Sequence, residues 1–128
     1  MGVRKKSRRT IAEVVEMTAA YFNLDVEVWI EIGKLKDNMA EAEDHGAGVY
    51  TLHFDKKFIK EDDEAELVKA AAHEMVHVKQ FELDGLRLEE NIGYMNGAEY
   101  NGDYWFSPWE IEARGYQDAF LHHYFSGK

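Results

Sequence analysis

The chain has 128 residues, 45% of them hydrophobic, which is enough to fill the core of one domain. It contains no cysteine, which excludes disulfide bonds and metal sites with thiolate ligands. No apolar run could span a bilayer, and the first apolar stretch, residues 11–22, carries two glutamates, so it is not a signal sequence. We therefore expect a cytoplasmic protein with no membrane partner.

The charge is unevenly distributed along the chain. Five of the first nine residues are basic, whereas the remaining ten basic and twenty-five acidic residues give the rest of the chain a net charge of −15. We expect a flexible basic tail at residues 1–9 and a single folded domain at residues 10–128. The acidic domain should repel the phosphates of a nucleic acid, so binding of nucleic acid is not expected there. The basic tail is the only segment suited to bind it.

A helix is predicted to begin at Thr10, which is spaced to form a capping box with Glu13. Its buried face would consist of positions at helical spacing: Ile11, Val14, Val15, Thr18, Tyr21 and Phe22. Residues 26–32 then alternate between apolar and mostly charged side chains, which predicts a strand with one buried face.

Residues 38–55 are expected to form a β-hairpin. The turn would lie in the glycine-containing segment 44–48, and the return strand at residues 49–55 would place Tyr50, Leu52 and Phe54 on one side. We expect a small three-stranded, largely antiparallel sheet, in which this return strand is either the edge strand or an ordinary core strand.

The next predicted helix has signals at both ends. Asp62 or Asp63 would cap its N-terminus, with Glu66 completing a capping box, and Gly85 would end it. Between these signals, apolar residues at helical spacing predict a buried seam: Leu67, Ala70, Ala71, Met75, Val78 and Phe81.

This helix carries the most informative motif of the chain, His73-Glu74-Met75-Val76-His77. Residues i and i+4 lie one above the other on a helix, so both imidazoles can bind a single metal ion. Glu74 lies about a quarter turn away, where its carboxylate can reach a water on that ion without being a ligand. Gln80, one turn after His77, is either a support for this site or a solvated side chain.

The segment 84–106 combines four glycines with five aromatic residues. Glycine marks turns, and a long irregular segment in a compact domain is usually functional or disordered. We expect a wall or lid of a cleft, with Tyr94 or Tyr104 donating a hydrogen bond to the reacting group, or aromatic side chains that only cover the core.

A closing helix is predicted from Ser107 as the N-cap residue and Pro108 at the first helical position. Its apolar face would be formed by Trp109, Ala113, Tyr116, Phe120 and Tyr124. Catalytic zinc usually has three protein ligands, so a third must join the two histidines. Glu110 and Glu112 are both candidates, because Glu110 could instead complete a capping box, Glu112 could be a solvated carboxylate, and helix geometry does not decide between them.

The two helical motifs, His73–His77 followed by Gln80 and Glu110-Ile111-Glu112-Ala113, resemble those of small gluzincins of the minigluzincin kind and of uncharacterised phage-encoded metallopeptidases. The resemblance implies that Glu110 is the third ligand and that an edge strand beside the metal binds a substrate peptide in extended form. Arg114 departs from the pattern, because an aspartate that supports a ligand is common at this position in the family.

We therefore expect an α+β fold of the minimal zincin kind: N-terminal helix, three-stranded sheet, His-Glu-x-x-His helix, long loop and C-terminal helix. The expected function is zinc-dependent hydrolysis of peptide bonds in peptide or protein substrates. Zn²⁺ held by His73, His77 and Glu110 would activate water, with Glu74 as the general base. The alternative is a non-catalytic protein-binding module or regulator that retains this fold, but the intact Glu74 favours the enzyme.

Overall fold

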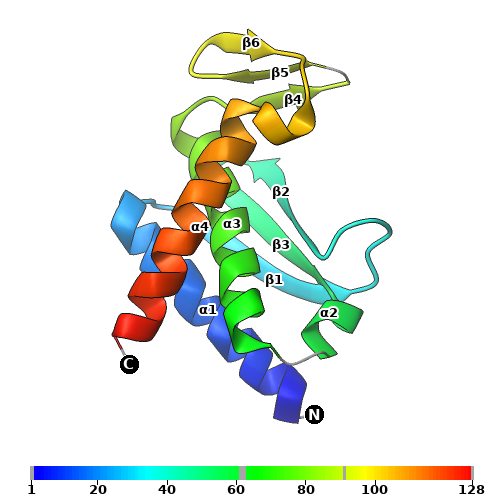
Figure 1. Cartoon of the computed structure of the whole chain (residues 1–128), viewed down its shortest axis with the longest axis vertical. Coiled ribbons are helices and arrows are strands. Elements are labelled where there is room, and N and C mark those ends of the chain that lie inside the picture. Colours follow the sequence, from blue (N-terminus) through cyan, green and yellow to red (C-terminus); the bar gives the residue numbers. More distant parts are fainter. Residues whose placement is uncertain (1, 61–62, 91, 128) are drawn as a thin grey trace.

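A computed structural model describes residues 2–60, 63–90 and 92–127 of the chain (Figure 1). Its elements follow the order α1 (Gly2–Phe22), β1 (Glu27–Gly33), β2 (Ala40–Gly46), β3 (Val49–Asp55), α2 (Lys56–Lys60), α3 (Glu64–Leu83), β4 (Arg87–Glu89), β5 (Ile92–Met95), β6 (Ala98–Tyr100), η1 (Tyr104–Phe106) and α4 (Pro108–Ser126). The predicted α+β class and order of the main helices and strands are confirmed. None of the helices in the described part of the chain is long and apolar enough to cross a membrane.

The main sheet is mixed, with the strand order β1-β3-β2. Strand β3 pairs in parallel with β1 and antiparallel with β2, and the β2–β3 hairpin turns through Ala47 and Gly48, both at positive φ. Of the two alternatives for residues 49–55, the structure has the core strand and not the edge strand. Strand β3 lies between β1 and β2, and its side chains Tyr50, Leu52 and Phe54 are almost completely buried in the core. Strand β2 is an edge strand instead.

Helix α3 is the central helix of the fold. It packs between α1 and α4 and also contacts β2 (Figure 1). The predicted seam of α3 is buried at Leu67, Ala71, Met75 and Val78, where it meets apolar side chains of α1, β3 and α4. This packing fixes the position of the His-Glu-x-x-His motif relative to both α4 and the edge strand β2.

Helix α1 begins earlier than predicted. It starts at Gly2, so the capping box at Thr10 is not its beginning, and the segment predicted as a flexible tail is helical from Gly2 onward; residue 1 lies outside the described residues. Tertiary contacts explain the extension, because Ser7 and Thr10 are buried and the Arg8 guanidinium donates a hydrogen bond of 3.1 Å to the Ile30 carbonyl. Tyr21, predicted to face inward, is exposed.

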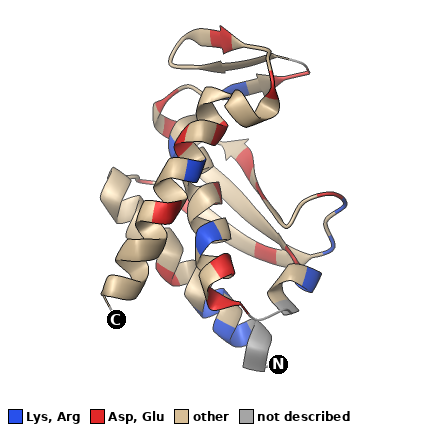
Figure 2. Cartoon of the chain, viewed as in Figure 1, with Lys and Arg blue, Asp and Glu red and all other residues tan. Residues whose placement is uncertain are grey.

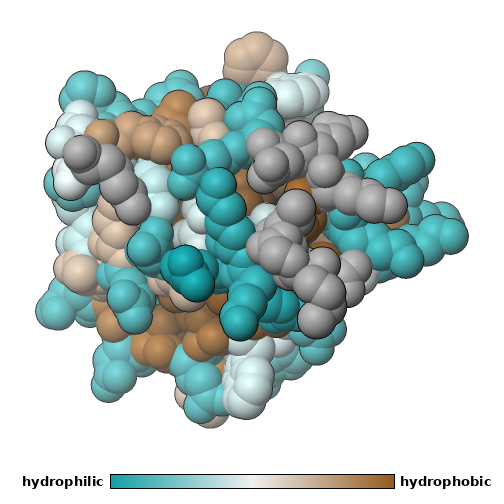
Figure 3. Space-filling model, turned by 90° about the horizontal axis from the view of Figure 1, so that it is seen from below, coloured by the Kyte–Doolittle hydropathy of each residue, from teal (hydrophilic) through white to brown (hydrophobic). Residues whose placement is uncertain are grey.

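The basic residues of α1 remain a distinct surface feature. Figure 2 shows Lys and Arg gathered on the first turns of α1, while Asp and Glu are spread over most of the other elements. Seen from this end, the molecule presents hydrophilic side chains interspersed with hydrophobic patches (Figure 3). The basic residues predicted from the sequence therefore lie together on the surface, although they belong to a helix and not to a flexible tail.

The segment predicted to be irregular contains a second, antiparallel sheet of strand order β4-β5-β6. It lies at the end of the molecule far from both termini (Figure 1) and has its own small core of Leu86, Met95 and Trp109. Asn96 and Gly97, both at positive φ, form the β5–β6 turn. An Asn-Gly pair between apolar runs is a strong hairpin signal, so the β5–β6 hairpin could have been predicted from the sequence.

Gly93 allows β5 to lie against α4. A Cβ at this position would overlap the Trp109 indole, with Cζ2 only 2.8 Å away. We expect Gly93→Ala to lower the free energy of unfolding by about 1–3 kcal/mol, the usual cost of overpacking. Gly115→Ala is the matched control, since its Cβ would meet open space on α4 and should stabilise the helix by about 0.5–1 kcal/mol. Urea denaturation of both variants measures the difference, and equal stabilities would contradict the close packing.

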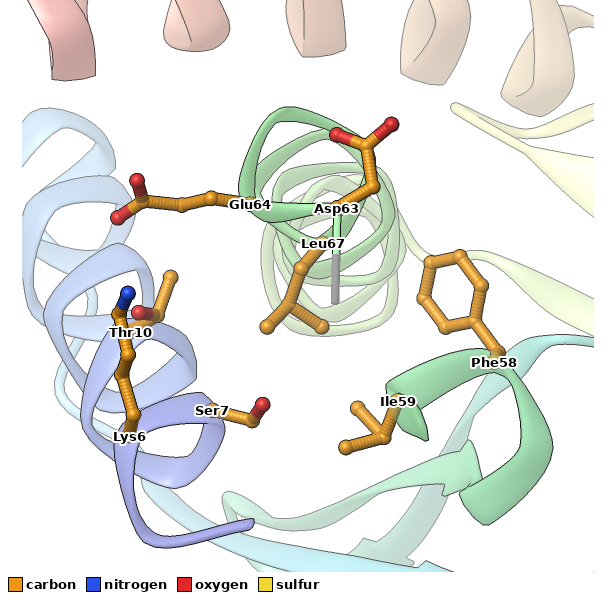
Figure 4. A pocket seen from close by; sticks show the side chains of 8 residues that line it. All are labelled: Lys6, Ser7, Thr10, Phe58, Ile59, Asp63, Glu64 and Leu67. Atoms are coloured by element: carbon orange, nitrogen blue, oxygen red, sulfur yellow. The ribbon is translucent and has the colours of Figure 1, made fainter. Parts of the chain in front are cut away.

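A small hollow lies at the junction of α1, α2 and the start of α3 (Figure 4). Its volume of about 10 Å³ is enough for about one water molecule. Ile59, Leu67 and Phe58 form its apolar side, and Ser7 and Thr10 face them from α1. The hollow is too small for a substrate, and it lies at the N-terminal end of α3, away from the His-Glu-x-x-His motif. We therefore regard it as a gap in the packing and not as a binding site.

Candidate metal centre

The ends of α3 are fixed largely as the sequence predicts. Asp63 is the N-cap residue and accepts a hydrogen bond of 3.2 Å from the Glu66 backbone N–H, while Asp62 lies outside the described residues. At the other end Gly85 adopts φ +66°, and the Leu86 N–H donates to the Gln80 carbonyl at 3.0 Å. The helix between these caps is continuous through His73 and His77, so both imidazoles project from one face, with ring centroids 4.9 Å apart.

Helix α4 brings a carboxylate to these imidazoles. Ser107 is the N-cap residue and Pro108 the first helical residue, as predicted, although the Ser107 hydroxyl donates to the Tyr104 carbonyl at 2.7 Å and caps nothing. Glu110, in the first turn, is 4% exposed and turns its carboxylate toward α3. The capping-box alternative for Glu110 is therefore not adopted.

Three side chains converge at this point. Glu110 Oε1 lies 3.1 Å from His73 Nε2, and Glu110 Oε2 lies 2.9 Å from His77 Nε2. Ligands at ~2.1 Å from a tetrahedral metal ion are separated by about 3.4 Å, so small adjustments would let all three bind one ion. The donor set of two imidazoles and one carboxylate is a common one for a divalent transition metal. His73, His77 and Glu110 could therefore hold a metal ion.

Glu112, the competing candidate ligand, points elsewhere. Its carboxylate accepts hydrogen bonds from Lys79 Nζ at 3.0 and 3.1 Å, and one oxygen also accepts from Gln80 Nε2 at 3.0 Å. Lys79 in turn pairs with Asp84 at 2.6 Å. Glu112 thus ties α4 to the C-terminal half of α3 and supports the centre without entering it.

Two glutamines hold the outer nitrogens of the imidazoles. Gln80, completely buried, places Oε1 2.8 Å from His77 Nδ1, while its Nε2 donates to the Trp109 carbonyl at 2.9 Å. Gln117 Oε1 lies 2.6 Å from His73 Nδ1. A carbonyl oxygen there accepts a hydrogen bond from each Nδ1–H, so a neutral imidazole would present the lone pair of its Nε2 to a metal ion bound in place of the Nε2 proton. Gln80 was predicted either to support the site or to be a solvated side chain. The structure has the first alternative, because Gln80 is buried and contacts His77.

Gln117 was not identified from the sequence. It lies seven residues after Glu110 on α4, so it shares the helix face of that carboxylate, and this spacing was the signal that could have revealed it. Arg114 stands where the resembling gluzincins commonly have an aspartate that supports a ligand. Here the glutamine amide occupies the outer side of His73, so the absence of that aspartate does not leave the imidazole without an orienting partner.

We expect Gln117→Leu to weaken metal affinity by about 10–100-fold, because loss of a partner that orients a ligand usually has this effect. Zinc titration against a chelating dye measures the change. Asp118→Asn, an exposed position one residue further along α4, is the control and should leave the affinity unchanged. Affinities equal to wild type in both variants would show that Gln117 does not orient His73.

The electrostatics of the cluster follow from burial and pairing. Burial alone would lower the pKa of His73 and of His77, but hydrogen bonds with Glu110 and the glutamines outweigh it and raise both pKa values. Burial would likewise raise the pKa of Glu110, but the two histidines hold it well below its usual range. Glu74, 8% exposed, has its pKa raised by burial, against the opposing influence of His77 and His73.

A cleft extends to both sides of the cluster. Two adjoining cavities of about 440 and 240 Å³ share part of their lining: Asn38, Ala40, His73, Glu74, Tyr104 and Glu110. Tyr104, from the segment predicted to form a cleft wall, thus lies beside the centre. The residue is 61% exposed, but partial burial of the hydroxyl and the Glu110 carboxylate raise the pKa of that hydroxyl. Tyr94 lies in β5 with the Arg87 guanidinium 4.3 Å from its ring centre, away from the cluster.

Comparisons with protein-family models, curated proteins and solved structures return no match to this chain.

Proposed function

We propose that this protein is a zinc-dependent hydrolase of peptide bonds. The observation that carries the proposal is the meeting of His73, His77 and Glu110 at one point in a cleft, with the Glu74 carboxylate in the lining of the same cleft. A purely structural metal site needs no unliganded carboxylate beside it, whereas a hydrolytic site needs a base. The resemblance of both helical motifs to gluzincins supports the same activity.

Zinc suits this set of donors because it accepts imidazole and carboxylate ligands in tetrahedral geometry. When bound by three protein ligands, it lowers the pKa of a water in the fourth position toward ~7 and polarises a carbonyl group. The two glutamines keep the imidazoles in the tautomer and orientation that such binding requires.

Glu74 is suited to act as the general base. It follows His73 directly on α3, so its side chain leaves the helix about 100° from that of His73 and lines both cavities. A base works best when its pKa approaches the working pH, and burial moves the pKa of Glu74 in that direction. In the proposed reaction, Glu74 accepts a proton from the attacking water and returns it to the leaving amine.

Tyr104 is suited to stabilise the developing negative charge. Its hydroxyl lines the cleft and is protonated at neutral pH, as a tyrosine ordinarily is, so it can donate a hydrogen bond to the carbonyl oxygen of the substrate. It reaches the cleft from η1, opposite the α3 face that carries the histidines.

The edge strand β2 provides a place for an extended peptide. Its far side, away from β3, has no strand neighbour in the described sheet, and Ala40 and Ala42 line the cleft beside Glu74. A substrate peptide added to this edge would gain main-chain hydrogen bonds along its length, which favours recognition of peptides over small molecules. The expected substrate-binding strand is thus β2, in place of residues 49–55.

The proposal is tested by incubating the zinc-loaded protein with a proteome-derived peptide library and identifying new peptide termini by mass spectrometry. We expect new termini with the zinc-loaded protein and none after treatment with a chelator, and activity should return when zinc is restored. A protein that binds one zinc ion per chain and yields no new termini would be a binding module or regulator, and the hydrolase proposal would be wrong.

A further inference from the structure

The two arms of the cleft differ in charge. The arm toward the C-terminal half of α3 is lined by apolar side chains, among them Phe81, Leu86 and Trp109, and its described lining holds no Lys or Arg. The arm toward the N-terminal half of α3 is the larger, at about 440 Å³, and contains Lys69 and Arg114. A substrate that crosses the metal centre would thus meet an apolar surface on one side and cations on the other.

Lys69 is already partly neutralised, whereas Arg114 is not. Lys69 Nζ lies 3.7 Å from a carboxylate oxygen of Glu66, which lines the same arm. The Arg114 guanidinium lies over the Trp105 ring, 4.8 Å from its centre, and donates one hydrogen bond to the Trp105 carbonyl. Among the described residues no ion pair involves Arg114.

The other terminal nitrogen of Arg114, Nη1, is buried and has no hydrogen-bond partner within the described structure. An unsatisfied buried donor on a charged group is costly, and in a native protein it calls for an explanation. Trp105 holds the guanidinium at the wall of the larger arm, where a shift of the side chain would expose the unused donor to a ligand. A guanidinium of this kind matches a carboxylate, which can accept two parallel hydrogen bonds from it.

We propose that Arg114 binds a carboxylate of the substrate peptide, either an Asp or Glu side chain or the peptide's C-terminus, in the larger arm of the cleft. The cleavage step rests on the proposed function, but the carboxylate binding does not. The site would select acidic peptides although the chain carries a net charge of −10, because a local guanidinium decides what enters this arm.

The spacing on α4 sets where the carboxylate would lie. Arg114 follows Glu110 by four residues, which is about 6 Å along a helix. Arg114 and Glu110 both line the larger arm, so the acidic group should occur close to the bond next to the metal centre and always on the same side of it.

The test measures binding and cleavage separately. For binding, zinc-loaded Glu74→Gln protein is immobilised, a randomised peptide library is passed over it, and the retained peptides are identified by mass spectrometry. We expect Asp, Glu or the free C-terminus to be enriched at one position by about fivefold or more. Adding Arg114→Gln should abolish this enrichment, Arg114→Lys should retain only part of it because lysine keeps the charge but not the paired donors, and Arg114→Glu should enrich Lys and Arg instead.

Arg87→Gln is the matched control, because Arg87 also lies over an aromatic ring but on β4, outside the lining of the cleft. It should leave the enrichment unchanged. Acid enrichment that persists with Arg114→Glu, or that never occurs with Arg114 intact, would overturn the proposal.

Cleavage sites produced by the zinc-loaded wild-type protein complete the comparison. Cleavage with no acid preference would leave the hydrolase proposal standing and refute the role of Arg114. Acid enrichment that depends on Arg114 without any cleavage would refute the hydrolase and leave the carboxylate site standing.

Discussion

Glu74→Gln should retain zinc and lose peptide hydrolysis. The amide of glutamine has nearly the shape of the carboxylate but cannot accept the proton of the attacking water, and removal of a general base usually lowers the rate by about 10²–10⁴-fold. Zinc binding should persist because the three ligand side chains, His73, His77 and Glu110, are untouched. The measurement is kcat/KM on a peptide found to be cleaved by the wild-type protein, together with the zinc content of both proteins.

The free energy of unfolding of Glu74→Gln shows whether a loss of hydrolysis results from the missing base or from misfolding. Glu74 is buried and burial raises its pKa, so replacing a carboxylate there with a neutral amide should not destabilise the fold. Glu64→Gln, an exposed position in the first turn of α3, is the control and should leave kcat/KM unchanged. A Glu74→Gln protein that is folded, zinc-loaded and as active as wild type would exclude Glu74 as the base.

The parts of the site that depend on local sequence could be predicted. The spacing of His73 and His77, the N-cap at Asp63 and the stop at Gly85 each follow from a few neighbouring residues, and the structure has all of them. The closing helix with Ser107 and Pro108 at its start is of the same kind. These features are encoded by helix geometry and caps, which do not require knowledge of the rest of the chain.

The parts that depend on tertiary contacts could not be predicted in this way. Helix α1 begins at Gly2 because Arg8 reaches β1, and β3 is central because the neighbouring strands bury it on both sides. The same holds for Gln117, which is an ordinary helical glutamine until α3 and α4 are packed together. Register between distant segments decides such positions, and hydrophobic periodicity alone does not encode it.

The choice between Glu110 and Glu112 shows the boundary between these two cases. Both glutamates fall in the first turns of α4, but residues two apart on a helix leave it in directions about 200° apart, so the two carboxylates reach different residues of α3. The structure turns Glu110 to the imidazoles and Glu112 to Lys79 and Gln80. The motif resemblance implies Glu110, and Glu110 is the glutamate that lies with His73 and His77.

Glu110→Gln should therefore lose zinc, while Glu112→Gln should keep it. An amide is a poor ligand for zinc, and loss of even an orienting partner costs about 10–100-fold in affinity, so loss of a ligand should cost about 100-fold or more. With zinc in excess, a 100-fold weaker affinity removes about 2.7 kcal/mol of zinc-dependent stabilisation. Thermal unfolding with and without zinc, in both variants and in wild type, measures this difference.

Glu112→Gln is matched to Glu110→Gln in chemistry and helix, but it alters the contacts with Lys79 and Gln80 and leaves all three proposed ligands in place. Lys79 keeps its ion pair with Asp84, and Gln80 keeps its hydrogen bond to the Trp109 carbonyl. The substitution should lower stability slightly and equally in the presence and absence of zinc, because an ion pair of this partly exposed kind contributes about 0–1 kcal/mol. If Glu112→Gln removes the zinc-dependent stabilisation and Glu110→Gln preserves it, α4 must be rotated from the position described, and the three-ligand centre would have to be rebuilt around Glu112.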